Sequence, residues 1–307
     1  MIVALAGGVG AARFLEGLAQ VISPADMYVI GNTGDDAEIH GLHISPDLDT
    51  VTYTLAGLAN PVHGWGLKGE TFHNLAALGR LGAETWFQLG DRDLATHLFR
   101  TERLRAGAKL SQVTRDIAKA FGLQATVVPM SDDPVRTIVV TPTGRLEFQT
   151  YFVRRRAEDA VRGIQFKGAD KARPAPGVLA AIAKAEAVIF CPSNPIISIG
   201  PILAVPGIRA ALEKRRKPVV AISPIVGGRA IKGPADKMMR GLKMDVSALG
   251  VAKFYKGLVD VFVLDEQDRA QATEVEALGM RAVVTNTIMS SQARKKALAR
   301  VVMKAIS

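Results

Sequence analysis

A short stretch near the N-terminus constrains the fold more than any other part of the chain. Residues 2–6, IVALA, form an apolar run, and residues 7–10, GGVG, place three glycines in four positions directly after it. The following segment, 11–22, has apolar residues at the spacing of an amphipathic helix. A buried strand, a glycine turn and a helix begin a βαβ unit, so the sequence predicts a parallel sheet covered by helices.

The pattern of strands and helices divides the chain into a core and an insertion. Residues 1–58 and 175–307 alternate strand and helix patterns, with apolar runs at the starts of 187–195, 217–228, 259–266 and 281–287. Residues 59–174 instead contain three helical patterns and then strand patterns at 126–130, 137–141 and 144–153, the last two as a hairpin. The sequence therefore predicts an α/β fold: a Rossmann-like, three-layer core with a parallel sheet, carrying residues 59–174 as a smaller helical and β-hairpin region.

The composition argues against a nucleic-acid-binding, membrane or secreted protein. The net charge is +10, but the basic residues are dispersed and aromatic residues make up 6% of the chain, so we expect no nucleic-acid partner. No apolar run is long enough to span a bilayer, and the N-terminus lacks the features of a signal peptide. The single cysteine, Cys191, fits a reducing compartment. We expect a cytoplasmic protein without a membrane partner.

The glycine turn favours phosphate binding. Gly8 and Gly10 permit a tight bend and close approach of the backbone to a phosphate at the helix N-terminus. Arg13 stands where a third glycine would complete a dinucleotide fingerprint, and the second strand pattern ends in Gly31 and Asn32 rather than in an acidic residue. These departures disfavour an NAD-dependent dehydrogenase. The alternative is a turn that needs glycine for its conformation alone.

Residues 31–50 form an acidic cluster beside this turn. The segment GNTGDDAEIHGLHISPDLDT contains five carboxylates, among them Asp35, Asp47 and Asp49. One or two carboxylates with phosphates and waters are the usual ligands of Mg²⁺. In an extended segment Asp47 and Asp49 would point to opposite faces, so we expect one of them to reach a shared site. The alternative for Asp49 is a cap on the helix that follows.

Several motifs, taken together in order, resemble one family. They are AGGVGAARFLEGL, GNTGDD, SPDLDTVTYTLAG, WFQLGDRDLATHLFRT, VVPMSDDPVRT, PSNPIISIGPIL and SPIVGG, and they extend from residue 3 to about residue 268. These stretches resemble the 2-phospho-L-lactate transferase family of coenzyme F-420 biosynthesis.

The resemblance implies a reaction. A phospho-acid group (phospholactyl, phosphoenolpyruvyl or phosphoglyceryl) moves from a guanosine diphosphate carrier to the ribityl hydroxyl of the deazaflavin Fo, GMP leaves, and Mg²⁺ is the cofactor. A homodimer is also implied. The absence of a covalent nucleophile motif agrees with direct displacement at phosphorus. The alternative is a nucleotide-sugar-binding regulator of a related family that shares the glycine turn and GNTGDD; residues 86–97 and PSNPIISIGPIL favour the enzyme.

The resemblance also suggests which residues form the site. We expect contacts with the guanosine diphosphate part from Gly8, Gly10, Arg13, Asn32, Ser193, Asn194 and Gly227. We expect the deazaflavin to meet Asp49, Gln88 and Arg92, although Gln88 lacks the basic charge that relatives can carry at that position. Asp49 is the predicted catalytic residue, and Asp35 and Asp49 are the predicted ligands of Mg²⁺.

Overall fold

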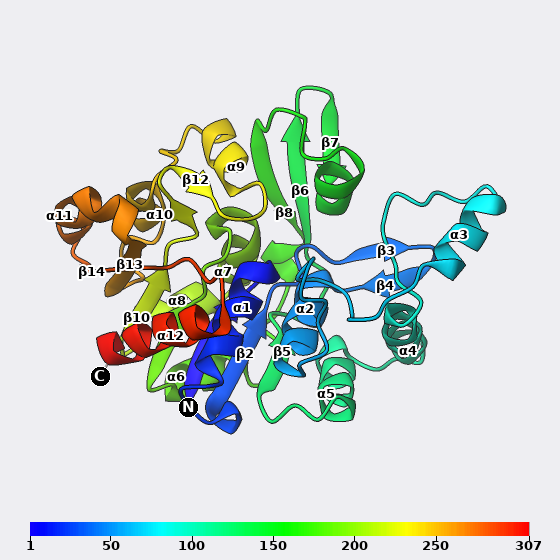
Figure 1. The fold of residues 1–307 in the computed structure, drawn as a ribbon, viewed down its shortest axis with the longest axis horizontal. Coiled ribbons are helices and arrows are strands. Elements are labelled where there is room, and N and C mark those ends of the chain that lie inside the picture. The colour runs from blue at the N-terminus through cyan, green and yellow to red at the C-terminus, as the bar shows by residue number, and fades with distance from the viewer. Residues whose placement is uncertain (307) are drawn as a thin grey trace.

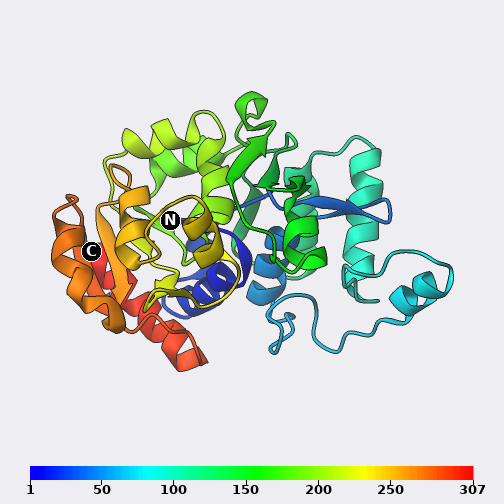
Figure 2. The same ribbon diagram turned by 90° about the horizontal axis from the view of Figure 1, so that it is seen from above.

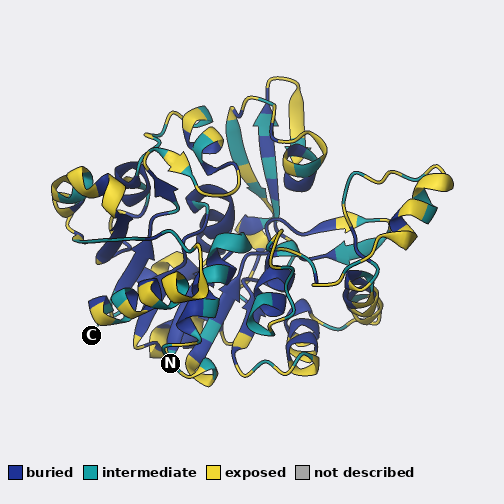
Figure 3. Cartoon of the chain, in the orientation of Figure 1, coloured by how far each residue is buried: buried dark blue, intermediate teal, exposed yellow. Residues whose placement is uncertain are grey.

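A seven-stranded parallel sheet forms the centre of the computed structural model, which describes residues 1–306 of 307. The strands are short and almost wholly buried because helices cover both faces of the sheet (Figures 1 and 3). From one edge to the other, the strands are β5 (Thr126–Pro129), β2 (Met27–Gly31), β1 (Ile2–Ala6), β9 (Ala187–Phe190), β10 (Val219–Ile222), β13 (Val261–Asp265) and β14 (Arg281–Thr285).

Alternate residues of each strand enter two separate apolar cores. In β1, Val3 and Leu5 face one core, and Ile2, Ala4 and Ala6 face the other. The core beneath Ile2 is closed by α1 (Gly8–Leu18), α2 (Pro46–Leu55), α5 (Leu110–Ala120) and α12 (Gln292–Ile306). The opposite core is closed by α6 (Val178–Lys184), α7 (Gly200–Ala204), α8 (Ile208–Glu213), α9 (Ala235–Gly241), α10 (Ala248–Phe254) and α11 (Ala272–Glu276). No helix within residues 1–306 combines the length and the apolar character needed to cross a membrane.

Two further groups of elements extend from the sheet (Figures 1 and 2). A three-stranded antiparallel sheet has the order β7-β6-β8, and a projecting arm contains a β-hairpin and two helices. The elements of these groups are β6 (Arg136–Thr141), β7 (Gly144–Glu147), β8 (Gly163–Lys167), β3 (Ala37–Ile39), β4 (Leu42–Ile44), α3 (His73–Arg80) and α4 (Asp93–Arg105). Short elements complete the chain: η1 (Pro24–Asp26), η2 (Thr150–Arg154), η3 (Ala169–Lys171), η4 (Pro195–Ile199), η5 (Glu266–Gln271), β11 (Ile225–Val226) and β12 (Arg229–Ala230).

The structure confirms the α/β class and the parallel sheet, and it corrects two expectations from the sequence. Strand β5 lies within the predicted insertion, 59–174, yet it pairs with β2 and forms an edge of the central sheet, so the predicted boundary is wrong for this strand. The hairpin of β6 and β7 is confirmed, but the predicted strand 144–153 ends at Glu147. The chain then turns into η2, which buries Tyr151 in the core.

A buried carboxylate at the end of β13 fixes the course of the chain after β14. The Asp265 side chain accepts hydrogen bonds from the backbone N–H of Thr287 at 2.8 Å, from the Thr287 hydroxyl at 3.0 Å and from the N–H of Gln267 at 3.1 Å. This bonding holds residues 287–290 against the carboxyl edge of the sheet.

We predict that Asp265→Ala lowers the free energy of unfolding by about 2–3 kcal/mol, because it leaves buried donors without an acceptor. Urea denaturation measures the change. Asp116→Ala, which removes an exposed ion pair with Arg103, should change stability by less than about 0.5 kcal/mol. Equal effects of the two substitutions would show that the Asp265 bonds are not structural.

Candidate active site

A cavity of about 740 Å³ opens at the carboxyl ends of β1 and β9. The strand order reverses between these two strands, since β2 and β5 lie on one side of them and β10, β13 and β14 on the other. Open α/β sheets bind ligands in the crevice at such a reversal. Residues 7–10 after β1 and 192–194 after β9 both line the cavity, so two of the motifs singled out in the sequence meet there.

The glycine turn brings the first helix close to the segment after β9. Gly8 has φ +71°, a left-handed conformation that favours glycine. Gly10 packs against the carbonyl oxygen of Pro192, and any side chain there would collide with it. Gly7 donates a long backbone hydrogen bond, 3.4 Å, to the hydroxyl of Ser193. The N-terminus of α1, the positive end of its dipole, therefore faces the cavity with no acidic residue in its first turn.

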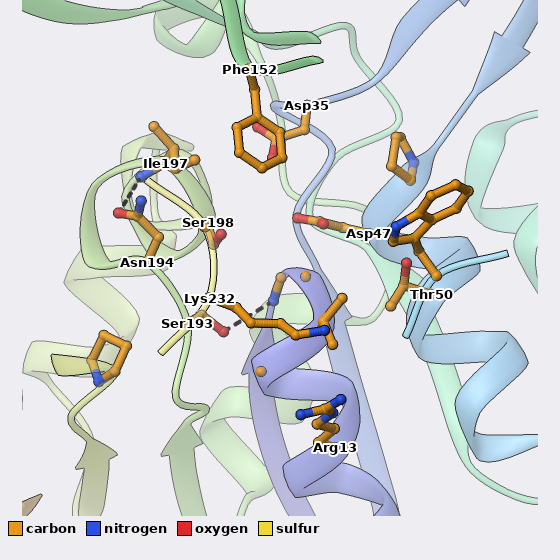
Figure 4. Close-up of a pocket in the computed structure, with 18 of the residues that line it drawn as sticks. Arg13, Asp35, Asp47, Thr50, Phe152, Ser193, Asn194, Ile197, Ser198 and Lys232 are labelled. Carbon is orange, nitrogen blue, oxygen red and sulfur yellow. Dashed lines mark hydrogen bonds between the residues drawn. The ribbon is translucent and has the colours of Figure 1, made fainter. Parts of the chain in front are cut away.

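Two cations lie beside this helix end without acidic partners. Arg13, on the second turn of α1, and Lys232, from the loop before α9, both line the cavity (Figure 4). Neither forms an ion pair with any residue in 1–306. Partial burial and the charge of Arg13 lower the pKa of Lys232, whose ammonium donates to the backbone carbonyl of His63 at 3.1 Å. This corner of the cavity is suited to an anionic ligand.

Two buried carboxylates, Asp35 and Asp47, lie across the glycine turn from these cations (Figure 4). Asn32 donates to Asp47 at 2.9 Å and to the carbonyl of Ile197 at 3.2 Å, which orients Asp47 toward the cavity. Burial, with the negative charge of Asp36, raises the pKa of Asp47 to about 7. Burial and the charge of Asp47 raise the pKa of Asp35 well above its usual range, and one Asp35 oxygen has no hydrogen-bond partner.

The position of Asp47 corrects an expectation. The sequence predicted that Asp47 points away from the site because the segment was taken as extended. The segment is the first turn of α2, with Pro46 at its start, and Asp47 accepts a hydrogen bond from the N–H of Gly8. Residues 47 and 49 lie about 200° apart around the helix, almost opposite each other. Both line the cavity because it extends past both sides of this turn, the side where Asn32 bonds Asp47 and the side where Arg100 bonds Asp49.

Asp49 is paired with a buried arginine. Arg100 Nη1 donates to Asp49 Oδ2 at 3.0 Å, and Nη2 contacts the other carboxylate oxygen. The imidazole of His97 lies 3.8 Å from Oδ2. Burial raises the pKa of Asp49 despite the opposing effect of Arg100. Since both oxygens already accept from Arg100, the geometry favours Asp47 over Asp49 as the partner of Asp35 in holding a metal ion.

Aromatic side chains line the cavity, and Phe152 lies on the far side of Asp35 and Asp47 from α1 (Figure 4). Phe148 and Phe152 are stacked, with ring centroids 5.4 Å apart and planes 9° from parallel. Phe87 and Trp65 also line the cavity, and Trp65 contacts the ring of His63 at 5.3 Å. A flat, conjugated ligand would stack favourably on such rings.

Most of the predicted site residues line this cavity. The ones that do are Gly8, Gly10, Arg13, Asp35, Asp49, Gln88, Ser193 and Asn194.

Three predicted contacts lie outside the cavity wall, each for a local reason. Asn32 is fully buried and orients Asp47. Arg92 is exposed and donates to the carbonyl of Lys68 at 2.8 Å. Gly227 donates its N–H to Asp268, and the neighbouring Val226 lines the cavity in its place. Asn194 lines the cavity, and its side chain also caps η4 by accepting from the backbone N–H groups of Ile196 and Ile197.

Other residues of the wall were not identified from the sequence. Lys232 lies in a short loop with no motif around it, whereas Asp93 and His97 fall within the motif WFQLGDRDLATHLFRT but were given no role of their own. Residues 287–290 follow the last strand. Because ligands of such folds bind at the carboxyl ends of parallel strands, their position could have predicted that they line the cavity. Within residues 1–306, no three His, Cys, Asp or Glu side chains converge to form a metal site.

Comparisons with known proteins agree with this geometry. The family model described as 2-phospho-L-lactate transferase CofD matches residues 2–306. A 2-phospho-L-lactate transferase of Methanosarcina mazei is 41% identical over 299 residues, covering 97% of this chain and 98% of its own. A phosphoenolpyruvate transferase of Streptomyces griseus is 46% identical over 305 residues, covering 97% of this chain and 96% of its own.

A solved structure supports the fold. The crystal structure of a protein of the UPF0052 family from Bacillus halodurans superimposes with a TM-score of 0.67 over 98% of both chains, at 16% sequence identity. The match of the family model over nearly the whole chain and the identity to the two transferases define its family. The chain belongs to the 2-phospho-L-lactate transferase CofD family and is a transferase of coenzyme F-420 biosynthesis.

Proposed function

We propose that this chain transfers a phospho-acid group from a guanosine diphosphate carrier to the ribityl hydroxyl of the deazaflavin Fo, with release of GMP. One observation carries the proposal: a single cavity has an anion-binding end at α1 and an aromatic end at Phe148 and Phe152, with carboxylates between them. The names of the relatives divide between phospholactate and phosphoenolpyruvate as the transferred group, and phosphoglycerate is a third candidate.

The anion-binding end suits the diphosphate of the donor. The N-terminus of α1 supplies backbone N–H groups and a positive dipole, and Arg13 and Lys232 supply two charges without acidic partners. Ser193 and Asn194, opposite Gly10, would form the second side of this compartment. Charge held here favours the departing GMP, whose phosphate gains negative charge as the bond breaks.

The carboxylates fit Mg²⁺. Asp35 and Asp47 are buried close together, their pKa values are raised, and an Asp35 oxygen has no hydrogen-bond partner. Such a pair is stabilised by a cation, and Mg²⁺ is commonly held by one or two carboxylates with substrate phosphates and waters. When bound, it would supply positive charge next to the diphosphate.

The residues of the chain suggest how the transfer proceeds. The ribityl hydroxyl oxygen of Fo bonds to the phosphorus that carries the acid, and the bond from that phosphorus to the bridging oxygen of GMP breaks. The hydroxyl proton passes to Asp49, which is held at the cavity wall by Arg100. GMP leaves with the electron pair of the broken bond, toward Arg13 and Lys232. The rest of the catalysis is positioning and neutralisation of charge.

Incubation of the protein with Fo, Mg²⁺ and each guanylyl-linked acid, with the products weighed by mass spectrometry, tests the proposal. We expect one donor to give a phospho-acid ester of Fo together with GMP. Absence of an adduct with all three donors would contradict it.

The alternative, a nucleotide-sugar-binding regulator, is separated by a fluorescence titration. A regulator should not bind Fo, whereas a transferase should bind it in the aromatic end of the cavity. The homodimer and the cytoplasmic location stay predictions from the sequence.

We predict that Arg13→Ala weakens the binding of guanosine diphosphate by about 1.5–3 kcal/mol, because a charge-assisted hydrogen bond to phosphate is lost. Isothermal titration calorimetry measures it. Arg92→Ala serves as the control, since Arg92 is exposed and outside the cavity wall. Unchanged affinity in a folded Arg13→Ala protein would place the diphosphate elsewhere.

We predict that Asp49→Ala reduces turnover by about 10²–10⁴-fold, the usual effect of removing an acid–base group. The affinity for guanosine diphosphate should change little, because Asp49 is bonded to Arg100 of α4 and the diphosphate is proposed to bind at Arg13 and Lys232. Steady-state rates at saturating Mg²⁺ and Fo, with calorimetry for the nucleotide, measure the two effects. Near-normal turnover would leave Asp49 as a structural partner of Arg100 only.

We predict a pH-dependent gain in stability for Asp47→Asn in the absence of divalent cations. An aspartate in the unfolded chain ionises near pH 4, whereas folded Asp47 keeps its proton up to about pH 7. The wild type therefore loses stability as pH rises through this interval, and the variant does not lose this part. Its advantage in Tm should grow from pH 5 to pH 7 and level off above.

Thermal melts in EDTA at constant ionic strength measure this advantage. Addition of Mg²⁺ at pH 8 should raise the Tm of the wild type and leave that of Asp47→Asn almost unchanged. A Tm difference independent of pH would show that Asp47 is ionised in the folded protein.

A further inference from the structure

A buried arginine behind the cavity wall is unexplained by packing. Arg100, on α4, is 1% exposed and belongs to the largest fully buried side chains of the described chain. Its Nη1 donates to Asp49 and, at 3.4 Å, to the carbonyl of His43, while its Nε has no partner. Burial of an arginine–aspartate pair contributes little to stability compared with apolar residues of similar volume. Stability alone therefore does not explain why Arg100 and Asp49 are buried together.

The pair belongs to a chain of polar groups that ends at the cavity. His97, one turn before Arg100, lies 3.8 Å from Asp49 through Nδ1 and 3.3 Å from Asp93 through Nε2. Asp93 accepts a hydrogen bond of 2.5 Å from the hydroxyl of Tyr53. Asp49, Tyr53, Asp93 and His97 line the cavity, whereas Arg100 does not. Arg100 thus lies on the far side of Asp49 from any ligand.

This arrangement restricts what Asp49 can do. A carboxylate that accepts from both terminal nitrogens of a guanidinium cannot rotate without breaking two charge-assisted hydrogen bonds. The lone pairs of Asp49 that Arg100 does not use therefore point in a direction that helix α4 fixes, whether or not a ligand is bound.

We propose that Arg100 is a positioning residue for the transfer: it acts through Asp49, holding that carboxylate in the orientation in which it receives the acceptor hydroxyl. The inference rests on the proposed function. It assigns Arg100 no contact with either substrate, so its removal should lower kcat far more than it changes the affinity for guanosine diphosphate or the KM for Fo. His97 and Asp93 would support the same orientation from one side.

A double-mutant cycle tests the proposal, because a residue that acts through Asp49 loses its effect when Asp49 cannot act. The four proteins are the wild type, Arg100→Gln, Asp49→Asn and the double variant, each assayed for kcat and for the KM of Fo. We expect Arg100→Gln to lower kcat at least 10-fold in the wild-type background and less than 2-fold in the Asp49→Asn background. Arg100→Lys, which keeps the charge but loses the fork, should recover part of the rate.

Controls separate positioning from a loss of folding. Arg103→Gln removes an exposed cation from the same helix and should leave kcat unchanged. Thermal melts and the dissociation constant of guanosine diphosphate report whether each variant is folded. Should Arg100→Gln fail to fold, the same cycle is run with Arg100→Lys, whose smaller loss of kcat should also disappear in the Asp49→Asn background.

Three outcomes overturn the inference. The first is unchanged kcat in the folded Arg100 variants. The second is an equal loss in both backgrounds, which marks a structural role. The third is a wild-type protein that transfers no group to Fo from any donor, which removes the proposed function as well and is recognised from the wild-type assay alone.

Discussion

The contact between the first glycine turn and the segment after β9 is the constraint on which the site depends. Gly10 lies so close to the carbonyl of Pro192 that only hydrogen fits between them, and this holds the start of α1 against residues 192–194. The strand order reverses at this point, so the two loops would otherwise diverge over opposite faces of the sheet. Because of this contact, the loop after β1 and the loop after β9 together form the floor of one cavity.

Charge is separated across that cavity. Positive charge gathers on one side, from Arg13, Lys232 and the helix dipole of α1, and two carboxyl groups with raised pKa values, Asp35 and Asp47, lie on the other. Neither set is neutralised by partners on its own side, and the raised pKa values of the two carboxylates show the cost of leaving them so. Groups left without opposite charges in this way are typical of a site whose ligands supply those charges.

The sequence predicted the parts of this structure that follow from local pattern. The strand–turn–helix opening and the parallel sheet came from apolar runs and glycine spacing, and the glycine turn and residues 193–194 were placed correctly in the cavity wall. Asp47 was misplaced because the sequence does not show that the cavity extends past both sides of the first turn of α2, so that two residues on nearly opposite sides both line it. The places of Lys232 and of β5 depend on tertiary contacts between distant segments, for which the sequence carries no local signal. Arg100 lies within the motif of residues 86–101, but its pairing with Asp49 is such a tertiary contact.

Helix α4 carries Asp93, His97 and Arg100 at intervals of four and three residues, which places all three on one face toward α2. Insertion or deletion of one residue within 93–100 would turn part of that face by about 100° and direct an arginine or an aspartate into an apolar core. The start of α4 is fixed as well, because Glu70 accepts hydrogen bonds from the backbone N–H groups of Arg92 and Asp93. A one-residue insertion or deletion inside α4 would therefore separate Asp49 from the arginine that holds it.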